Sequence, residues 1–585
     1  MNRIERLRIL LLLSLGLLTI RLIHLQMLRG TLYRRLAEQN RLRLVPEQAP
    51  RGLIIDRQGR VLATNRTVFR LALVPQELED LPFVLSHVSH LVHRPVKSLE
   101  EQFQQERTLP FLPATIVSNV PKEVALRLEE ESWQWPGLLV KSETIRDYPL
   151  GSTAAHLLGY LSQPTAEELP LLKQYGVHPR QLVGRMGLER LLDQALRGQP
   201  GGLMVEVNHR GRQVRVLGRR VPQAGARVVL TIDAQLQSLI EQAFEAQPGA
   251  CVVLDPHTGE VLAMASSPSF QPEAFITGDA NAIHGYLTDS HTPLMNRATD
   301  GSYQPGSIMK LVTAGTALER QIITPATTID CEGSITIGDR VFHCWNRDGH
   351  GPMVLRDALI QSCNVYFMSV ARRLGLESLR TGMMQMGLAR RTGWLFEEQA
   401  GTLPQHHVMP GMVAMLGIGQ GEVLITVLQG AVMAGVFANK GWLVEPWVIR
   451  SVGNRSLIPS APRRRVGWSS ETIDAVRQGM IAVVRDPYGT GHRAFSSLIS
   501  IAGKTGTAQT HIPGRAHGWF VGFCPVEQPR VAMAILWEHG GSGGDLPADI
   551  AKTICEYVKV TDALLPKPER NHLPFVRETM APTHP

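Results

Sequence analysis

The chain has 585 residues, 44% of them hydrophobic and 19% charged, a composition that excludes an intrinsically disordered protein and that, at this length, predicts several domains. Its formal net charge of +8 lies almost wholly in residues 1–60, which hold twelve Arg, no Lys and four acidic residues. The remaining sequence is therefore balanced, which argues against a nucleic-acid-binding body and predicts a basic collar beside an anionic bilayer.

An apolar stretch near the start predicts a membrane anchor. Residues 9–20 read ILLLLSLGLLTI, and the apolar pattern continues past Arg21 as far as Leu28. About 20 residues are enough to span a bilayer, and the long Arg21 side chain can reach an interface. No small-x-small cleavage site follows, so an uncleaved span over 9–29 after a cytoplasmic tail of residues 1–8 is favoured over a signal peptide. Arginines flank the span on both sides, which leaves its orientation open.

Residues 30–220 have a mixed pattern. A helical pattern covers 31–43, and residues 49–65 predict two strands around a turn at Arg57-Gln58-Gly59. Residues 122–131 form an amphipathic helical segment. No acid/base constellation was found here, so the region is interpreted as a spacer or docking domain that ends near the turn-rich segment 219–227.

Residues 221–564 predict a second, α+β domain. A buried-type strand over 227–233 precedes an amphipathic helix over 234–247, and 249–266 predict two strands around a turn ending in Gly259. Further on, strands and helices mix without a βαβ repeat, which favours an α+β fold over a doubly wound sheet. The tail, residues 565–585, contains five prolines and is predicted to be disordered.

Three short motifs in this domain could carry chemistry. Ser307 and Lys310, in YQPGSIMKLVTAG, would share a face of a helix that begins after Gly306, which places an amine beside a hydroxyl. QSCNVYF contains Ser362 and Asn364 amid apolar residues. SIAGKTGTAQT contains Lys504, Thr505, Gly506 and Thr507. A phosphate-binding loop is rejected, because Leu498 stands where its first glycine is needed. Residues 417–421 likewise fail the dinucleotide-binding glycine spacing.

The order S-x-x-K, S-x-N and K-T-G resembles the active-site motifs of penicillin-binding proteins and serine β-lactamases. Longer segments, including APRGLIIDRQGRVLATN, VGRMGLERLLDQALRGQPG and MNRATDGSYQPGS, are similar to class B penicillin-binding proteins of the elongation type, penicillin-binding protein 2. This resemblance implies an N-terminal transmembrane helix in the bacterial inner membrane and an elongated pedestal or dimerisation-like domain. It also implies a periplasmic transpeptidase domain with an antiparallel sheet and flanking helices, similar to serine β-lactamases.

The resemblance also implies a reaction. The family cross-links D-Ala-D-Ala stem peptides through a serine ester, has serine-type carboxypeptidase relatives, and is acylated by β-lactam antibiotics. It assigns the nucleophile to Ser307 and the base to Lys310, and it implies oxyanion donors at the backbone N–H groups of Ser307 and Thr507. The remaining roles are proton relay for Ser362, and positioning of Lys310 and the substrate amide for Asn364. Lys504, Thr505 and Thr507 would receive the terminal carboxylate, and Gly506 would let a backbone approach the ligand closely. Family members often have Asp at position 364 and some have Ser at 505, and we expect these departures to alter rates rather than the reaction.

Three cysteines and a histidine form a candidate zinc site. Cys331, Cys344, His350 and Cys363 have the spacing C-x12-C-x5-H-x12-C, and such a donor set is typical of structural zinc. The resemblance to the elongation-type family also implies a bound zinc ion. Two of its ligands in that family are often aspartates, which leaves Asp330 as an alternative to Cys331. A Cys331–Cys344 disulfide and unconnected thiols remain open as well.

The other cysteines, Cys251, Cys524 and Cys555, lie in apolar segments and are expected to be core thiols.

Other functions were weighed against this one. They are a β-lactamase, a division-type transpeptidase, a bifunctional wall polymerase and a non-catalytic β-lactam sensor or scaffold. The length, the anchor and the Cys/His segment favour the elongation-type enzyme. For that enzyme the family implies a membrane-embedded glycan polymerase of the shape, elongation and division class and elongation scaffold proteins as partners.

Overall fold

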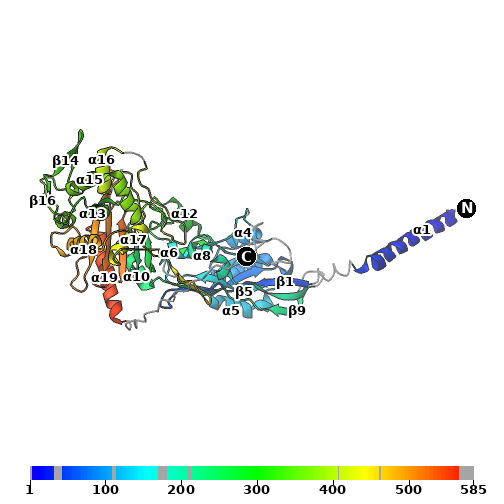
Figure 1. Ribbon diagram of the computed structural model, residues 1–585. Helices are drawn as coiled ribbons and strands as arrows, with labels where there is room; N and C mark the ends of the chain where they lie inside the picture. Colours follow the sequence, from blue (N-terminus) through cyan, green and yellow to red (C-terminus); the bar gives the residue numbers. More distant parts are fainter. Residues whose placement is uncertain are drawn as a thin grey trace.

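The computed structural model describes residues 3–31, 42–107, 113–165, 167–168, 181–207, 213–405, 408–459, 463–510 and 512–564. Helix α1 (Arg3–Ile23) continues into the π-helix η1 (His24–Leu28). Within the described chain, Arg8–Leu28 is the one helix long and apolar enough to cross a membrane, and it coincides with the predicted anchor. It protrudes from the rest of the protein, followed by the pedestal and then by the larger C-terminal domain (Figure 1).

The pedestal is built from sheets with short helices. Its strands are β1 (Leu42–Glu47), β2 (Ile54–Ile55), β3 (Val61–Leu73), β4 (Ala114–Val120), β5 (Leu138–Asp147), β6 (Leu161–Ser162), β7 (Val183–Gly184), β8 (Gly201–Val207) and β9 (Gln213–Arg220). Its helices are η2 (Pro75–Glu77), α3 (Leu81–Val92), α4 (Val96–Glu106), α5 (Lys122–Glu130), η3 (Ser132–Gln134), α6 (Ala155–Leu158), α8 (Gly187–Leu191) and α9 (Asp193–Arg197).

The outcome for the predicted pedestal elements follows from these bounds. The β2–β3 hairpin with its turn at Gly59 (φ +87°) and the amphipathic helix α5 are confirmed. The helix predicted over 31–43 falls mostly on residues outside the described part, and its last two residues belong to strand β1. A separate apolar core lies between β3, β4, α3 and α4.

A sheet joins the pedestal to the C-terminal domain. Its order is β19-β18-β10-β2-β3-β4, with β5 paired to β3, so strands from both sides of residue 220 belong to it. Beside it, the fully buried Glu189 carboxylate accepts hydrogen bonds of 2.6 Å from both Arg51 Nε and Arg146 Nε. Removing one partner of a buried ion pair typically costs about 3–5 kcal/mol, so this network stabilises the pedestal next to the shared sheet.

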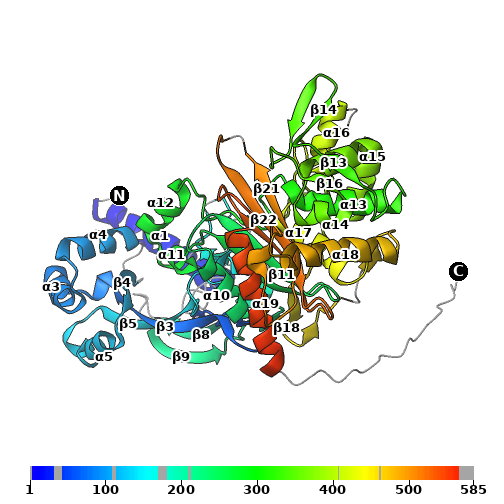
Figure 2. The ribbon, with the colours of Figure 1, turned by 90° about the vertical axis from the view of Figure 1, so that its left-hand side faces the viewer.

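The C-terminal domain has a five-stranded antiparallel sheet in the order β12-β11-β23-β22-β21. Helices α10 and α19 cover one face, and α17 with the helices around α13 and α15 covers the other (Figure 2). The strands are β10 (Val228–Leu230), β11 (Gly249–Leu254), β12 (Val261–Ser267), β13 (Ile329–Cys331), β14 (Ser334–Ile337), β15 (Arg340–His343), β16 (Gly351–Met353), β17 (Trp442–Val444), β18 (Ile449–Val452), β19 (Arg455–Ser456), β20 (Arg463–Arg465), β21 (Ala502–Gln509), β22 (Ala516–Cys524) and β23 (Val531–Trp537).

The helices of this domain are α10 (Ala234–Ala243), α11 (Pro272–Thr277), α12 (Ala280–Thr288), η4 (Gly306–Met309), α13 (Lys310–Glu319), α14 (Leu355–Ile360), α15 (Asn364–Gln385), α16 (Pro410–Gly417), α17 (Val427–Ala438), α18 (Ser470–Arg485), η5 (His492–Ala494) and α19 (Leu546–Leu564). Helix α10 begins where the Asp233 side chain accepts hydrogen bonds from the N–H groups of Gln235 and Leu236. The predicted β11–β12 hairpin and the α+β class are confirmed. The predicted disordered tail, 565–585, lies outside the described residues.

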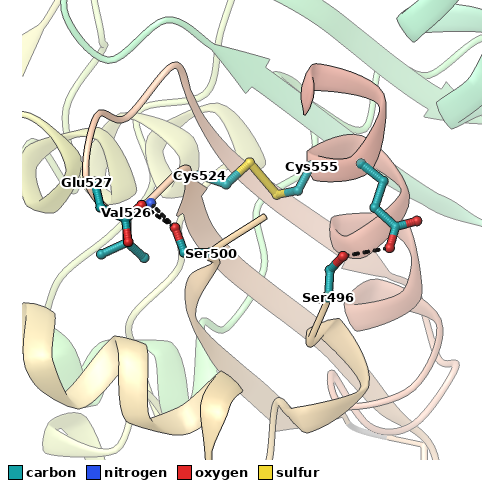
Figure 3. Close-up of a disulfide and its surroundings, with 7 residues drawn as sticks. Ser496, Ser500, Cys524, Val526, Glu527 and Cys555 are labelled. Carbon is teal, nitrogen blue, oxygen red and sulfur yellow. Dashed lines mark hydrogen bonds between the residues drawn. A yellow bond between two sulfur atoms is a disulfide. The ribbon is translucent and has the colours of Figure 1, made fainter. Parts of the chain in front are cut away.

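The prediction that Cys524 and Cys555 are core thiols is wrong. They form a disulfide that joins the end of β22 to α19, with their Cα atoms 6.0 Å apart (Figure 3). Both residues are fully buried, so the apolar surroundings were predicted correctly and the pairing was not. Sequence alone could not reveal it, because the two segments are brought together only when α19 packs on the sheet. Cys251 is a buried free thiol, as expected.

Replacing both Cys524 and Cys555 with Ser is expected to lower the free energy of unfolding by about 3 kcal/mol. The reason is that a cross-link over 31 residues reduces the entropy of the unfolded chain. Urea denaturation monitored by circular dichroism measures the effect, and a reductant should lower the midpoint of the wild-type protein but not that of the variant. Equal midpoints for oxidised wild type and variant would contradict the assignment.

Candidate active site

Ser307 and Lys310 lie at the start of a buried helix. Gly306–Met309 form the 3₁₀ turn η4, and α13 begins at Lys310, so the two side chains are separated by one helical turn as predicted. Ser307 is half-buried and Lys310 is fully buried. Gly306 has φ +56°, and a Cβ there would lie 2.7 Å from the Thr507 carbonyl oxygen. Glycine at 306 therefore lets the turn that carries Ser307 contact strand β21 directly.

The segment between α14 and α15 places Ser362 against Lys310. Lys310 Nζ lies 3.1 Å from Ser362 Oγ, 2.7 Å from the Ser362 carbonyl oxygen and 2.7 Å from Asn364 Oδ1. Ser362 itself has φ +52°, a left-handed conformation that is uncommon for a residue other than glycine. Backbone strain of this kind persists where the surrounding structure enforces it, which is common at active sites.

Strand β21 supplies the third motif. Lys504 Nζ donates to Ser362 Oγ at 3.0 Å and to the Thr505 carbonyl oxygen at 3.0 Å. A Cβ at Gly506 would lie 2.9 Å from the Pro305 carbonyl oxygen, so β21 passes next to the turn that carries Ser307. Thr507 is exposed beside it, whereas Thr505 is buried. The structure thus brings together all the residues of the three sequence motifs.

Both lysines are buried, and this changes their protonation. Burial lowers the pKa of Lys310 to about 7. Burial, and then the charge on Lys310, hold the pKa of Lys504 well below its ordinary value. Two ammonium groups bridged by one hydroxyl repel each other, so the two lysines are not both positively charged near neutral pH. A neutral Lys310 amine, one helical turn from Ser307, can act as a base.

Two further residues at this site were missed by the sequence analysis. The Thr505 hydroxyl donates to Thr490 Oγ1 at 2.7 Å, and the Thr490 N–H donates to the Ile360 carbonyl oxygen. Thr490 therefore connects β21 with the segment that leads to Ser362. The indole N–H of Trp345, a largely exposed side chain, donates to the Gln361 carbonyl oxygen at 2.9 Å. Neither residue belongs to a motif that a single sequence reveals.

The predicted zinc ligands converge beside the active site. The ligand atoms of Cys331, Cys344, His350 and Cys363 all lie within 4.8 Å of one another. His350 Nδ1 lies 3.4 Å from Cys331 Sγ and 3.6 Å from Cys344 Sγ. Zinc bonds of about 2.3 Å to sulfur and 2.0 Å to nitrogen give a tetrahedron whose N–S edge is about 3.5 Å. The donor set and its spacing therefore fit a zinc ion.

The structure also bears on the alternatives for this cluster. Asp330 is exposed on strand β13, whereas the neighbouring Cys331 is buried in the cluster. Cys331 and Cys344 are free thiols rather than a disulfide. The N–H of Asn364 donates to Cys344 Sγ at 3.4 Å, and Cys363 lies between Ser362 and Asn364. The cluster is thus joined directly to the catalytic segment.

Comparison with known proteins matches these two domains to two family models. The penicillin-binding protein transpeptidase domain matches residues 249–556, and the penicillin-binding protein dimerisation domain matches residues 46–230. The chain is 31% identical to the peptidoglycan D,D-transpeptidase MrdA of Acinetobacter baumannii, covering 92% of this chain and 84% of that relative. The chain belongs to the class B penicillin-binding proteins, in the penicillin-binding protein 2 family.

Solved structures agree with this membership. Penicillin-binding protein 2 from Helicobacter pylori, in complex with MreC, superimposes with a TM-score of 0.76 at 28% identity, over 88% of this chain and 99% of that one. A chain of a peptidoglycan synthase complex, described as coordinating polymerization and crosslinking, superimposes with a TM-score of 0.72 at 31% identity, over 94% and 97%. Similarity over the full length, pedestal included, fits a shared architecture rather than a shared catalytic domain alone.

Proposed function

We propose that this chain is an elongation-type peptidoglycan D,D-transpeptidase that uses Ser307 as its nucleophile. The observation that carries the proposal is the Ser362 hydroxyl, which lies 3.1 Å from Lys310 Nζ and 3.0 Å from Lys504 Nζ next to the Ser307 turn. A serine hydroxyl is a weak nucleophile until a base takes its proton, and this arrangement supplies both the base and a proton relay.

The first half of the reaction forms an ester. Neutral Lys310 accepts the Ser307 proton as Ser307 Oγ attacks the carbonyl carbon between the two D-alanines of a stem peptide. The N–H groups of Ser307 and Thr507 stabilise the oxyanion, a contribution of about 3 kcal/mol per donor in comparable enzymes. The proton passes through Ser362 to the departing amine, the peptide C–N bond breaks, and the terminal D-alanine leaves.

The strand residues hold the substrate in this scheme. The terminal carboxylate of the stem peptide binds at Lys504, Thr505 and Thr507, and the Thr505 hydroxyl exchanges its hydrogen bond to Thr490 Oγ1 for one to the carboxylate. Asn364 fixes Lys310 through its side-chain oxygen, 2.7 Å away. Gly506 leaves room for the substrate backbone to lie along β21.

In the second half, the amine of a neighbouring stem peptide attacks the ester carbonyl and releases Ser307 with a new cross-link. Attack by water instead gives carboxypeptidase activity, the expected side reaction. A β-lactam forms the same ester but has no leaving group that diffuses away, so the enzyme remains acylated. The long lifetime of this penicilloyl ester distinguishes a transpeptidase from a β-lactamase.

Acylation by penicillin should become faster as pH rises through about 7, the pKa of Lys310. Below that value the Lys310 amine is protonated and cannot accept the Ser307 proton, so the rate should fall about tenfold per pH unit well below the pKa. Stopped-flow or gel measurements with a fluorescent penicillin give this profile, taken between about pH 5 and 9 in steps of about half a pH unit. An acylation rate that does not change between about pH 6 and 8, on either side of the Lys310 pKa, would rule out Lys310 as the base.

The Cys331–Cys344–His350–Cys363 cluster is proposed to hold one structural zinc ion. Such an ion would supply rigidity, because its ligands would be Cys331 in β13, Cys344 directly after β15, His350 directly before β16 and Cys363 directly before α15. Cys363 follows Ser362 directly and caps α15 by accepting from the Tyr366 N–H. The cluster therefore holds Ser362 and Asn364 in position for Lys310.

The cellular setting follows from the anchor and from the relatives. The anchor is proposed to cross the inner membrane once, with both domains in the periplasm where stem peptides are found. Scaffold and glycan-polymerase partners are proposed because the similar structures are a complex with MreC and a peptidoglycan synthase complex. A non-catalytic sensor or scaffold is disfavoured by the complete lysine–serine–lysine arrangement, and a division-type enzyme by the similarity to MrdA proteins.

The proposal is tested by reconstituting the full-length chain with a glycan polymerase of the shape, elongation and division class and with its lipid-linked precursor. Cross-linked products that form with this chain and disappear with penicillin are the expected result. Uncross-linked glycan in both samples would overturn it.

A further inference from the structure

The three-stranded sheet β1-β8-β9 has an unusual outer strand. Strand β9 lies at the edge of the sheet and, among the described strands, pairs with β8 alone. All its residues from Arg215 to Arg220 are exposed, so it buries neither face. A strand in a soluble domain normally buries one face, because a few strands without a covered apolar face are barely stable in water.

The exposed side chains are both apolar and basic. Val216 is 51% exposed, Val221 69%, and Met204 on the neighbouring strand 47%. The sheet strands also contain four arginines against two glutamates. Arg215 forms an ion pair with Glu206, and Arg219 forms one with Glu47. Arg220 adds a further positive charge. Large apolar groups interspersed with arginine are typical of a surface that meets the boundary between lipid headgroups and acyl chains.

The chain connectivity keeps this sheet near the bilayer. The apolar helix ends at Leu28 and β1 begins at Leu42, so the intervening residues 29–41 can extend at most about 45 Å. Strand β9 lies two strands from β1, or about 10 Å across the sheet. Figure 1 shows β1 and β9 at the end of the pedestal from which the chain runs to α1.

We propose that strand β9 is a second membrane contact, which lies on the anionic lipid headgroups of the leaflet next to the pedestal. This inference rests on the anchor proposed above and goes beyond the proposed reaction. Arginine suits this role because its guanidinium group binds a phosphate through two parallel hydrogen bonds. A contact at β9 would fix the tilt of the pedestal relative to the bilayer, and thus the height at which the active site meets the glycan.

The test uses full-length protein in nanodiscs with an environment-sensitive bimane probe on Val216→Cys. The matched control is Val341→Cys, a valine on strand β15 of the C-terminal domain that is 53% exposed. The free native thiols of the described chain, Cys251, Cys331, Cys344 and Cys363, are buried, and probe-treated wild type reports any background. Covalent penicillin labelling in the same nanodiscs monitors the proposed reaction separately.

With brominated phosphatidylglycerol in the bilayer, we expect about two-fold quenching at position 216 and none at 341. Arg220→Gln should raise the phosphatidylglycerol fraction needed for half-maximal quenching. Unquenched emission at 216 in anionic bilayers would overturn the proposal. So would equal quenching at 341, or protection of 216 only when the glycan polymerase is added, which would assign the strand to a protein partner.

Discussion

Replacing Ser307 with Ala is expected to abolish covalent labelling by a fluorescent penicillin and to lower the transpeptidation rate by about 10⁴-fold or more. Without the hydroxyl no ester can form, and neither Ser362 nor Thr507 is placed to substitute. Ser362 Oγ already lies between two lysine amines, and Thr507 lies on the strand assigned to the carboxylate. Labelling is measured by gel fluorescence, and transpeptidation by chromatography of muramidase-digested product.

A second half-buried serine, outside the site, provides the control for this experiment. Ser238 lies on α10, where it accepts a hydrogen bond from Gln242 on the same helix. Ser238→Ala should keep wild-type labelling, and both variants should unfold at nearly the wild-type temperature, because a half-buried Ser307 hydroxyl contributes little to packing. Undiminished labelling of Ser307→Ala would remove Ser307 as the nucleophile.

The second large effect is expected for Cys344→Ser. This change removes one of four converging donors, and it also removes the sulfur that accepts from the Asn364 N–H. We expect zinc content to fall from about one equivalent to near zero, and the loss of a structural ion to cost at least about 3 kcal/mol of unfolding free energy. That cost corresponds to a fall in Tm of about 4 °C for a domain of this size.

The acylation rate should fall with the zinc in this variant. Ser362 and Asn364, to which the proposed reaction assigns roles, flank Cys363, so loss of the ion would free the segment that holds Lys310. Mass spectrometry of metals, thermal unfolding and penicillin labelling measure the three effects. Cys251→Ser is the matched control, since Cys251 is an equally buried thiol on β11 outside the cluster. Wild-type protein purified without chelator and free of zinc would refute the metal site.

The residues of the site could be predicted because the sequence keeps each motif within a few positions. Ser307 and Lys310 are one helical turn apart, so their proximity is a local property of the helix. The same holds for Lys504 to Thr507, which follow one another along a strand, and for the apolar run that forms α1. Local periodicity therefore determined the anchor, the β2–β3 and β11–β12 hairpins, helices α5 and α10, and the three candidate motifs.

The contacts between those motifs depend on packing over long sequence distances. Ser362 Oγ contacts Lys310, which is 52 residues away in the sequence, and Lys504, which is 142 residues away. Thr490 and Thr505 are 15 residues apart, and no sequence pattern predicts their hydrogen bond. Cys524 and Cys555 form a disulfide only because α19 packs on the sheet next to β22.

The choice between Asp330 and Cys331 shows the limit most clearly. Neighbouring residues on a strand point to opposite faces, so only one of the two can reach the cluster. The sequence offered both residues as ligands but could not fix which face of strand β13 is turned inward. The pairing of Cys331 with Gly351 on β16 decides it, because that register buries Cys331 beside His350 and leaves Asp330 in solvent. Composition and local spacing thus determined which side chains this protein has for its chemistry, while the tertiary structure decided which of them meet.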